Sequence, residues 1–306
     1  MKDSKMRVEI VRCKNLSLPL VEVTYTDKNG KECKGLMLLD TCSTDNLLMG
    51  DIARTMKTAS LEGAEKKTIF ALGDEKVEMP YVKAVIGLGG EQHEENFLVS
   101  EDFQVQVRGD RPFVGVLGMV FMFEHELVID FPSYSVYRPS AESEDDREGE
   151  LDYVFPMLFG LKKYSMPVVG IKGENGEVVA MLDTGSHESI ITKSVLPELG
   201  TDYTLTDETS LTYGVAGAVE SKRVEADFHL ITAKNNEMGA HTLKKSDTFY
   251  AVDCSLCSSN QPVDTPADQR YPDVKVLLGA GFMDTQGWTI DFARCMIYQR
   301  HAVRTA

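Results

Sequence analysis

The stretch that decides the fold is LDTCSTDNLL, residues 39–48, in which an apolar run ends at Asp40 and is followed by Thr, Cys and Ser. A second stretch, MLDTGSHESII at residues 181–191, repeats the arrangement with glycine in place of the cysteine. A short, continuous apolar run bounded by polar residues is typical of a buried strand. The two stretches therefore predict two equivalent strands, each of which ends in a loop that carries one aspartate.

The similarity between the two halves extends well beyond these loops. VLGMVFM at 116–122 corresponds to LLGAGFM at 277–283, and VIDF at 128–131 corresponds to TIDF at 289–292. Gly118 precedes Asp130 by 12 positions, and Gly279 precedes Asp291 by the same 12. Several matches in one order and register indicate an internal repeat. We also match FLV at 97–99 with FYA at 249–251, because this divides the additional residues of the second copy evenly.

Each copy opens with a strand pattern that is followed by an Asn-Gly hairpin signal, at residues 29–30 and 175–176. Short strands with regular turns dominate, and the candidate helices are residues 46–57, residues 189–199 and the segments after each Leu-Gly pair. The predicted fold class is mainly β, with two homologous lobes. We place the N-terminal lobe at 1–140, an acidic linker at 141–152 and the C-terminal lobe at 153–306.

Length and composition narrow the possible classes of function. The 306 residues suffice for two domains, and the net charge of −16 disfavours a nucleic-acid partner. No apolar run approaches the roughly 20 residues of a membrane helix, and the N-terminus shows no secretory signal. We therefore expect a cytoplasmic protein with six reduced cysteines. Cys254 and Cys257 have C-x-x-C spacing without a second pair, so loop thiols are favoured over zinc, and no metal or cofactor is expected.

The duplication gives the two aspartates a chemical meaning. Two homologous lobes that pair about an approximate two-fold axis would bring equivalent loops face to face. Asp40 and Asp183 would then meet, and two adjacent carboxyls cannot both ionise without a large electrostatic cost. One proton is shared, which leaves one acid and one base. Such a pair can activate a water molecule and protonate a leaving amine.

With these motifs, the chain resembles an aspartic peptidase of the retropepsin-like superfamily, as a single chain of two tandem, pepsin-like lobes. The resemblance covers most of 19–138 and 166–299. It implies an aspartic endopeptidase that hydrolyses peptide bonds with water activated by an Asp40/Asp183 dyad. It also implies supporting roles in the two loops: cross-bracing by Thr41 and Thr184, bonds near the carboxylates from Ser43 and Ser186, and packing behind the loops by the Leu-Gly pairs at 117–118 and 278–279.

The resemblance further implies a β-hairpin flap over the cleft from each lobe. Tyr213 and Gly214 lie where the second flap is expected, and Leu72 and Gly73 are their counterparts in the first lobe. An ordinary hairpin turn has the same sequence pattern. His187 follows the second motif directly; a histidine that is exposed or at a helix start is favoured over one that tunes the dyad.

Cys42 departs from the family pattern, which has glycine at this place, as Gly185 does in the second copy. Three interpretations follow: a site that tolerates the cysteine, a catalytically impaired peptide-binding or scaffolding protein, or a redox brake on the cleft. Because Asp40, Thr41 and Ser43 are present, we favour activity. The expected partner is a peptide or protein substrate, and the expected state is a monomer with intramolecular lobe pairing, against the alternative that the repeats dimerise between chains.

Overall fold

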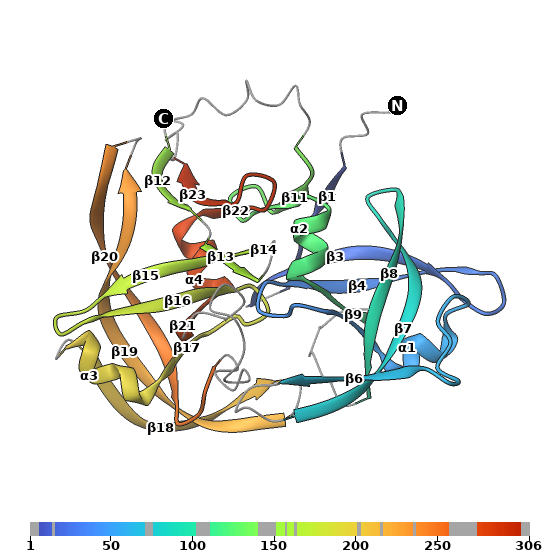
Figure 1. Cartoon of the computed structure of the whole chain (residues 1–306), viewed down its shortest axis with the longest axis horizontal. Coiled ribbons are helices and arrows are strands. Elements are labelled where there is room, and N and C mark those ends of the chain that lie inside the picture. Colours follow the sequence, from blue (N-terminus) through green and yellow to red (C-terminus); the bar gives the residue numbers. More distant parts are fainter. Residues whose placement is uncertain are drawn as a thin grey trace.

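The computed structural model describes residues 6–13, 16–70, 76–101, 111–139, 151–156, 158–161, 164–200, 203–214, 217–234, 237–256 and 274–300. Figure 1 shows two β lobes, with the strands of the first half of the chain on the right and most strands of the second half on the left. The predicted fold class, mainly β with two lobes and few short helices, is confirmed. Within the described ranges, no helix combines the length and the apolar character needed to span a lipid bilayer.

The first lobe is one sheet with the strand order β2-β3-β4-β9-β5-β8-β7-β6. Its helices are short and follow β5 and β9. The strands are β2 (Val11–Cys13), β3 (Leu16–Thr26), β4 (Glu32–Asp40), β5 (Asn46–Met49), β6 (Glu65–Phe70), β7 (Lys76–Leu88), β8 (Glu91–Ser100) and β9 (Phe113–Gly118), and the helices are α1 (Gly50–Thr55) and α2 (Met119–Glu124).

The second lobe repeats this connectivity in the order β15-β16-β21-β17-β20, with β19 paired to both β15 and β20 and with β18 paired to β19. A small separate sheet precedes it, made of β13 (Leu158–Leu161) and β14 (Tyr164–Met166). The other elements are β15 (Val168–Lys172), β16 (Glu177–Asp183), β17 (Ser189–Thr192), η2 (Lys193–Val195), α3 (Leu196–Leu199), β18 (Tyr203–Gly214), β19 (Gly217–Lys234), β20 (Glu237–Val252), β21 (Val274–Gly279) and α4 (Ala280–Gln286).

The register of the strands is the same in the two lobes. Asp40 on β4 pairs in parallel with Gly118 on β9, and Asp183 on β16 pairs in parallel with Gly279 on β21. The next strand also agrees, because β5 starts opposite Phe97 and β17 starts opposite Phe249. The matching of residues 97–99 with 249–251 is therefore correct, and equivalent positions can be assigned across the lobes.

A further group of strands joins the lobes, in the order β1-β11-β10-β22-β23-β12. At its centre, Ile129 pairs with its own counterpart Ile290, while Val128 pairs with Asp291 and Asp130 with Thr289. This antiparallel register is the one that an approximate two-fold axis between the lobes produces. The strands are β1 (Arg7–Glu9), β10 (Val128–Asp130), β11 (Ser135–Tyr137), β12 (Leu151–Pro156), β22 (Trp288–Asp291) and β23 (Met296–Arg300).

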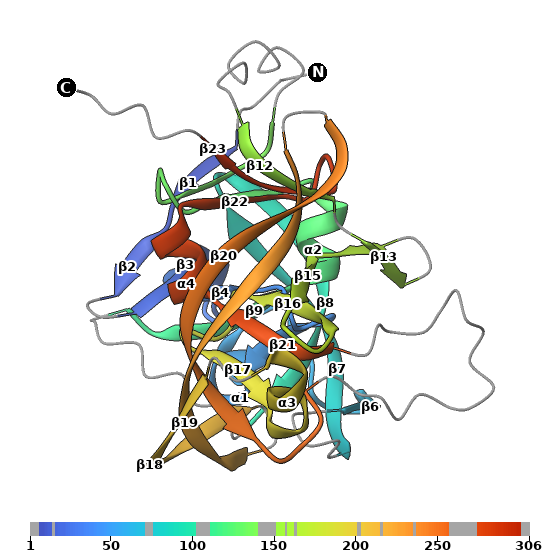
Figure 2. The ribbon, with the colours of Figure 1, turned by 90° about the vertical axis from the view of Figure 1, so that its left-hand side faces the viewer.

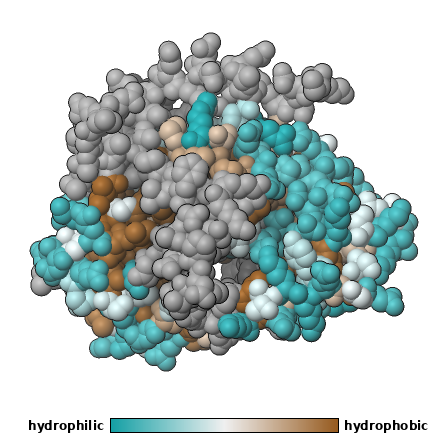
Figure 3. All heavy atoms as spheres, in the orientation of Figure 1, coloured by the Kyte–Doolittle hydropathy of each residue, from teal (hydrophilic) through white to brown (hydrophobic). Residues whose placement is uncertain are grey.

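The burial of the two motif-bearing strands explains why their sequences are continuous apolar runs. Residues 36–39 on β4 and 180–182 on β16 are at most 3% exposed, since each of these strands lies inside a sheet that is covered on both faces. Phe121 on α2 and Phe282 on α4 are buried at equivalent positions. In Figure 3 the outward surface of the first lobe, on the right, is mainly hydrophilic.

Three expectations about local structure need comment. The helix predictions were wrong at their starts, because residues 46–49 and 189–192 are the strands β5 and β17, whose buried leucines and isoleucines lie between neighbouring strands. Most of the expected linker lies outside the described residues, and β12 begins at Leu151, inside the range given to the linker. Leu72 and Gly73, expected in the first flap, also lie outside the described residues.

Figure 2 shows β19 and β20 as a long twisted ribbon along the second lobe. The two strands run for 18 and 16 residues. They are much longer than their first-lobe counterparts β7 and β8, which have 13 and 10 residues. β19 also pairs with β12, so the second lobe and the strands that join the lobes form one continuous sheet.

Candidate active site

The two aspartate loops meet between the lobes and are bound to each other by their threonines. The Thr41 N–H donates to Thr184 Oγ1 at 3.0 Å, and the Thr184 N–H donates to Thr41 Oγ1 at 3.1 Å. Each hydroxyl also donates across the interface, Thr41 to the Leu182 carbonyl at 2.5 Å and Thr184 to the Leu39 carbonyl at 2.6 Å. Both threonines are fully buried. These reciprocal bonds fix the two aspartates next to each other.

Each aspartate is held by the backbone of its own loop. One carboxylate oxygen of Asp40 accepts hydrogen bonds from the N–H groups of Cys42 at 2.8 Å and Ser43 at 3.1 Å, and Asp183 accepts one from Gly185 at 2.9 Å. The second loop passes close to Asp40, since a Cβ added at Gly185 would lie 2.4 Å from the carboxyl carbon of Asp40. The two carboxyl groups therefore lie next to each other, with Asp183 buried and Asp40 partly exposed.

The electrostatics of the pair follow from desolvation and from this proximity. Burial raises the pKa of Asp40, against two backbone hydrogen bonds that lower it. Burial and the nearby charge of Asp40 raise the pKa of Asp183 to about 7, although hydrogen bonds to its carboxylate oppose the rise. Two carboxyls in mutual repulsion titrate as a pair. The pair can therefore hold a proton at pH values where an isolated aspartate would have lost it.

Cys42 lies directly against this pair. Its thiol hydrogen-bonds to the Asp183 carboxylate, an interaction that lowers the pKa of Asp183. Its Sγ also lies 3.9 Å from the Leu182 carbonyl oxygen. At the equivalent place in the second loop, Gly185 has no side chain, and its backbone packs close to Asp40 instead. The two sides of the pair thus differ by one thiol group.

The two motif serines have a different bonding pattern from the one implied by the family resemblance. The Ser43 hydroxyl donates to the Asp45 carbonyl at 2.7 Å, and the Ser186 hydroxyl donates to the Glu188 carbonyl at 2.8 Å. Serine hydroxyls often bond to nearby backbone groups in turns. Here the hydroxyls stabilise the loops, while the backbone N–H of Ser43 contacts the carboxylate.

The Leu-Gly pairs support the loops from behind. Gly118 and Gly279 have no room for a side chain, because an added Cβ would lie 2.5 Å from the Asp45 carbonyl oxygen and 2.4 Å from that of Glu188, respectively. Their N–H groups donate to the side chains of Asn46 at 2.9 Å and Ser189 at 3.0 Å. Sequence analysis missed Asn46 and Ser189, although each follows its aspartate by the same six positions.

The two hairpins that are expected to be flaps lie partly within the described residues. In the second lobe, Tyr213 pairs with Ala218 and Gly214 with Gly217, which makes the end of β18 and the start of β19 a hairpin. In the first lobe, β6 and β7 form the corresponding hairpin. Lys67 on β6 forms an ion pair of 2.5 Å with Asp45, which lies in the loop after Asp40. The first hairpin is therefore connected to its aspartate loop.

Two other expected positions lie apart from the pair. His187 Nδ1 accepts a hydrogen bond at 3.1 Å from the N–H of Ser17 on β3, so this ring connects the two lobes. It is partly buried, not exposed. Cys254 is partly buried, and Cys257 lies outside the described residues.

Comparison with known proteins agrees with this geometry. Residues 163–252 match the family model described as retroviral aspartyl protease. The structure is similar to the crystal structure of aspartic proteinase from Irpex lacteus, with a TM-score of 0.57 and 12% sequence identity, over 99% of this chain and 99% of that chain. No curated protein matches the chain. By its two-lobed fold and by the family match over residues 163–252, the chain is similar to the aspartic peptidases.

Proposed function

We propose that the protein is an aspartic endopeptidase that hydrolyses peptide bonds with a water molecule activated by Asp40 and Asp183. One observation carries the proposal: the reciprocal Thr41–Thr184 bonds hold the two carboxyls next to each other, and the pKa of Asp183 is raised to about 7 by burial and by its partner's charge. A pair that retains one proton near neutrality contains both an acid and a base. Peptide hydrolysis requires both in one place.

The proposed reaction has two stages. The ionised carboxylate accepts a proton from water while the water oxygen forms a bond to the scissile carbonyl carbon, and the protonated carboxyl donates its proton to the carbonyl oxygen. The resulting tetrahedral diol collapses as the carboxyl that took the proton from water gives it to the amide nitrogen, the C–N bond breaks, and a diol hydroxyl returns its proton to the other carboxylate. The pair then again holds one proton and can activate the next water. Because the two carboxyls titrate as a coupled pair, the roles of acid and base belong to the pair and not to one fixed residue each.

Cys42 is the reason to consider a second function, that of a catalytically impaired protein that binds peptides on the same fold. Its thiol lies beside Asp183, whereas at the equivalent Gly185 the Asp40 carboxyl leaves no room for a side chain. We favour activity because the thiol hydrogen-bonds to the carboxylate without separating the threonine-linked loops. The substrate is a peptide or protein, and the raised pKa of Asp183 favours work nearer to neutral pH than to strongly acidic pH.

The decisive experiment is a digest of a peptide library by the full chain from about pH 3 to pH 8, read by mass spectrometry. Wild type is compared with Asp40→Asn, Asp183→Asn and the control Asp51→Asn, which changes an exposed aspartate on α1. We expect cleavage by wild type and the control and none by the two loop variants, with circular dichroism showing intact folding. Wild-type cleavage by Asp183→Asn would contradict the mechanism. Peptide binding without cleavage by wild type would establish the second function.

A further inference from the structure

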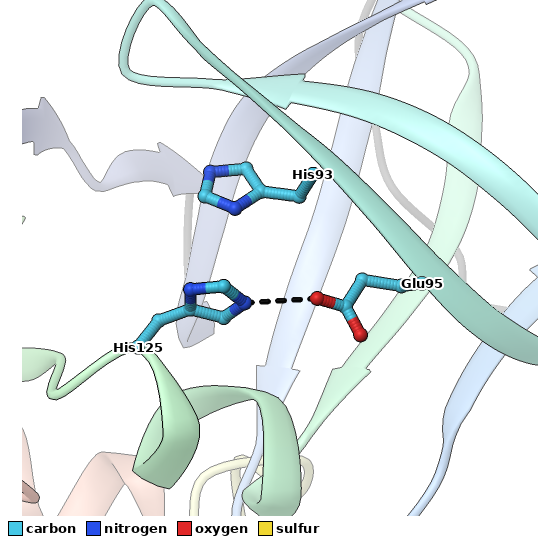
Figure 4. Close-up of side chains that lie close together, drawn as sticks. All are labelled: His93, Glu95 and His125. Carbon is cyan, nitrogen blue, oxygen red and sulfur yellow. Dashed lines mark hydrogen bonds and ion pairs between the residues drawn. The ribbon is translucent and has the colours of Figure 1, made fainter.

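A second group of polar side chains lies in the first lobe, between β8 and α2. His93 and Glu95 are two residues apart on β8 and therefore project from the same face of the strand. His125 caps the C-terminal end of α2. Figure 4 shows the two imidazoles near each other, with the Glu95 carboxylate beside His125. Among the described residues, these three can each offer one ligand atom, and the three atoms lie within 4.8 Å of one another.

The contacts within this His-Glu-His cluster leave a nitrogen unused. His125 Nε2 lies 2.9 Å from Glu95 Oε1, and the ring centroids of His93 and His125 are 4.6 Å apart. His93 is only 6% exposed, yet its Nε2 has no hydrogen-bond partner among the described residues. A half-turn of the ring exchanges nitrogen and carbon positions, so the orientation of this imidazole can adapt to a ligand. A buried polar atom without a partner destabilises the fold unless something binds it.

The protonation state of His93 suits a metal ligand. Burial lowers the pKa of His93, and the neighbouring His125 lowers it further. Both effects favour the neutral imidazole, which is the form that coordinates a metal. Arg138 is the nearby cation, and its charge is offset by an ion pair of 3.1 Å with Glu91.

The second lobe provides an internal comparison, because the shared register assigns a counterpart to each member of the cluster. His93 corresponds to Lys245, Glu95 to Asp247 and His125 to Gln286, counted from Phe249 and Gly279. There, the Lys245 ammonium donates a hydrogen bond to the Gln286 side-chain oxygen, and Asp247 accepts one from Ser189 at 2.5 Å. In the second lobe, a hydrogen bond between lysine and glutamine side chains therefore takes the place of the two imidazoles. The two histidines of the first lobe are a feature that the architecture does not require.

We propose that His93, Glu95 and His125 bind one divalent transition-metal ion of the zinc type, with water as the fourth ligand. Two imidazole nitrogens and one carboxylate oxygen are a donor set that zinc accepts. In a tetrahedral zinc site the ligand atoms are about 3.4 Å apart, as follows from bonds of about 2.0–2.2 Å. In the structure, one pair of ligand atoms is 2.9 Å apart and no pair is more than 4.8 Å apart. The ligand spacing of a tetrahedral zinc site lies within this range. Side-chain rotation alone can therefore close the site.

The metal would link β8 to the end of α2. The first residue of this helix, Met119, donates its N–H to the Ser43 carbonyl of the first aspartate loop at 2.7 Å. The ion would thus hold the helix that supports the loop, while remaining outside the dyad. This inference depends on the geometry of the first lobe and stands apart from the proposed peptidase activity.

The test uses the full chain after treatment with a chelator, titrated with Zn²⁺ by calorimetry and with Co²⁺ by visible absorption. We expect one tightly bound Zn²⁺ per chain, a rise in the thermal unfolding midpoint, and cobalt bands of a tetrahedral site without a thiolate charge-transfer band. Glu95→Gln should weaken binding at least tenfold, as loss of a charged ligand does. The control His229→Gln, which changes an exposed histidine on β19, should bind like wild type.

The variant His93→Lys/His125→Gln introduces the residues of the second lobe at these positions. It should fold, because the same pair of side chains closes the equivalent position there, and it should lose Zn²⁺ binding and the metal-dependent rise in unfolding midpoint. If this folded variant still bound Zn²⁺ like wild type, if cobalt showed thiolate ligation, or if wild type bound no Zn²⁺, the proposed site would be wrong. None of these readouts uses peptide cleavage.

Discussion

Asp183 contributes to the pH dependence of the stability of this protein. Its pKa in the folded chain is about 7, above the ordinary value of 3.8, so the fold favours the protonated carboxyl. The corresponding stability is fully present below about pH 4 and is lost as the pH rises through about 7. A shift of about three units corresponds to as much as about 4 kcal/mol.

From this follows a prediction for Asp183→Asn, which cannot ionise. At about pH 8 the variant should have a higher free energy of unfolding than wild type, by up to a few kcal/mol, and at about pH 4 the difference should nearly vanish. Urea unfolding at both pH values measures this. A variant that is less stable than wild type at the higher pH would show that the carboxyl is not held in its protonated form.

Cys42 carries a second prediction at the same scale. Cys42→Gly removes the thiol from beside Asp183 and restores the pattern of the other loop. We expect kcat/KM to rise severalfold and the alkaline limb of the pH–rate profile to move to higher pH, because a hydrogen bond that lowers the pKa of Asp183 is lost. Cys42→Ser keeps a donor and serves as the control, with the limb near its wild-type position. A slower Cys42→Gly enzyme would show that the cysteine assists the site.

Individual residues of the candidate site were predictable where the same spacing occurs twice. Asp40 and Asp183, with their threonines, stand at matched positions in matched patterns, and the structure brings them together. The bonding of the serine hydroxyls to the Asp45 and Glu188 carbonyls was not predictable, because it depends on the local turn of each loop. The His93, Glu95 and His125 cluster was equally hidden, since it joins positions on different elements with no motif spacing.

Among the elements, the hairpin of β6 and β7 allows a test of the hypothesis that it is a flap over the substrate cleft. Lys67 on β6 pairs with Asp45 beside the first motif, and both side chains are partly exposed, at 44% and 22%. Lys67→Met should change the free energy of unfolding by less than about 1 kcal/mol, because exposed ion pairs contribute little. It should alter KM for peptides, since the hairpin loses its connection to the loop. Lys66→Met, on an exposed neighbouring position, is the control.

A steady-state assay of both variants on one peptide separates the two effects. An unchanged KM in Lys67→Met, together with unchanged stability, would show that this hairpin does not cover the substrate.

At the level of elements, strands were predicted correctly from the sequence where the strand pattern ended at an Asn-Gly turn signal. The Asn-Gly pairs mark the β3–β4 and β15–β16 turns correctly. Residues 46–49 and 189–192 were misassigned to helices, because a short buried strand and the start of a buried helix have the same run of apolar residues. The length of β19 and β20 could not be derived, since it depends on pairing with the distant strands β12 and β15.

For the molecule as a whole, the pairing of β10 with β22 and the bonds between the threonines place both halves of the site in one chain. We therefore predict that peptidase activity per molecule stays constant on dilution, since no second chain has to associate. Activity assays over a wide range of enzyme concentration, with light scattering at the highest, measure this. A loss of specific activity on dilution, together with a dimer by light scattering, would favour pairing between chains.

The overall architecture was the most predictable level, because two matched copies and one linking segment restrict how the chain can be arranged. The joining strands were harder to foresee. β1 comes from the N-terminal segment and β12 from the start of the second half, and both attach to strands far away in sequence. Neither carries a repeat motif that would have indicated its partner.

The close approach of Gly185 to Asp40 has a consequence for how such a site can evolve. In an assembly of two identical chains, every mutation appears on both sides of the symmetry axis at once. Here position 42 is a cysteine while position 185 is a glycine, where a side chain would collide with the Asp40 carboxyl. Joining both lobes in one chain therefore permits asymmetric solutions, in which one half of a site carries a group that the other half has no room for.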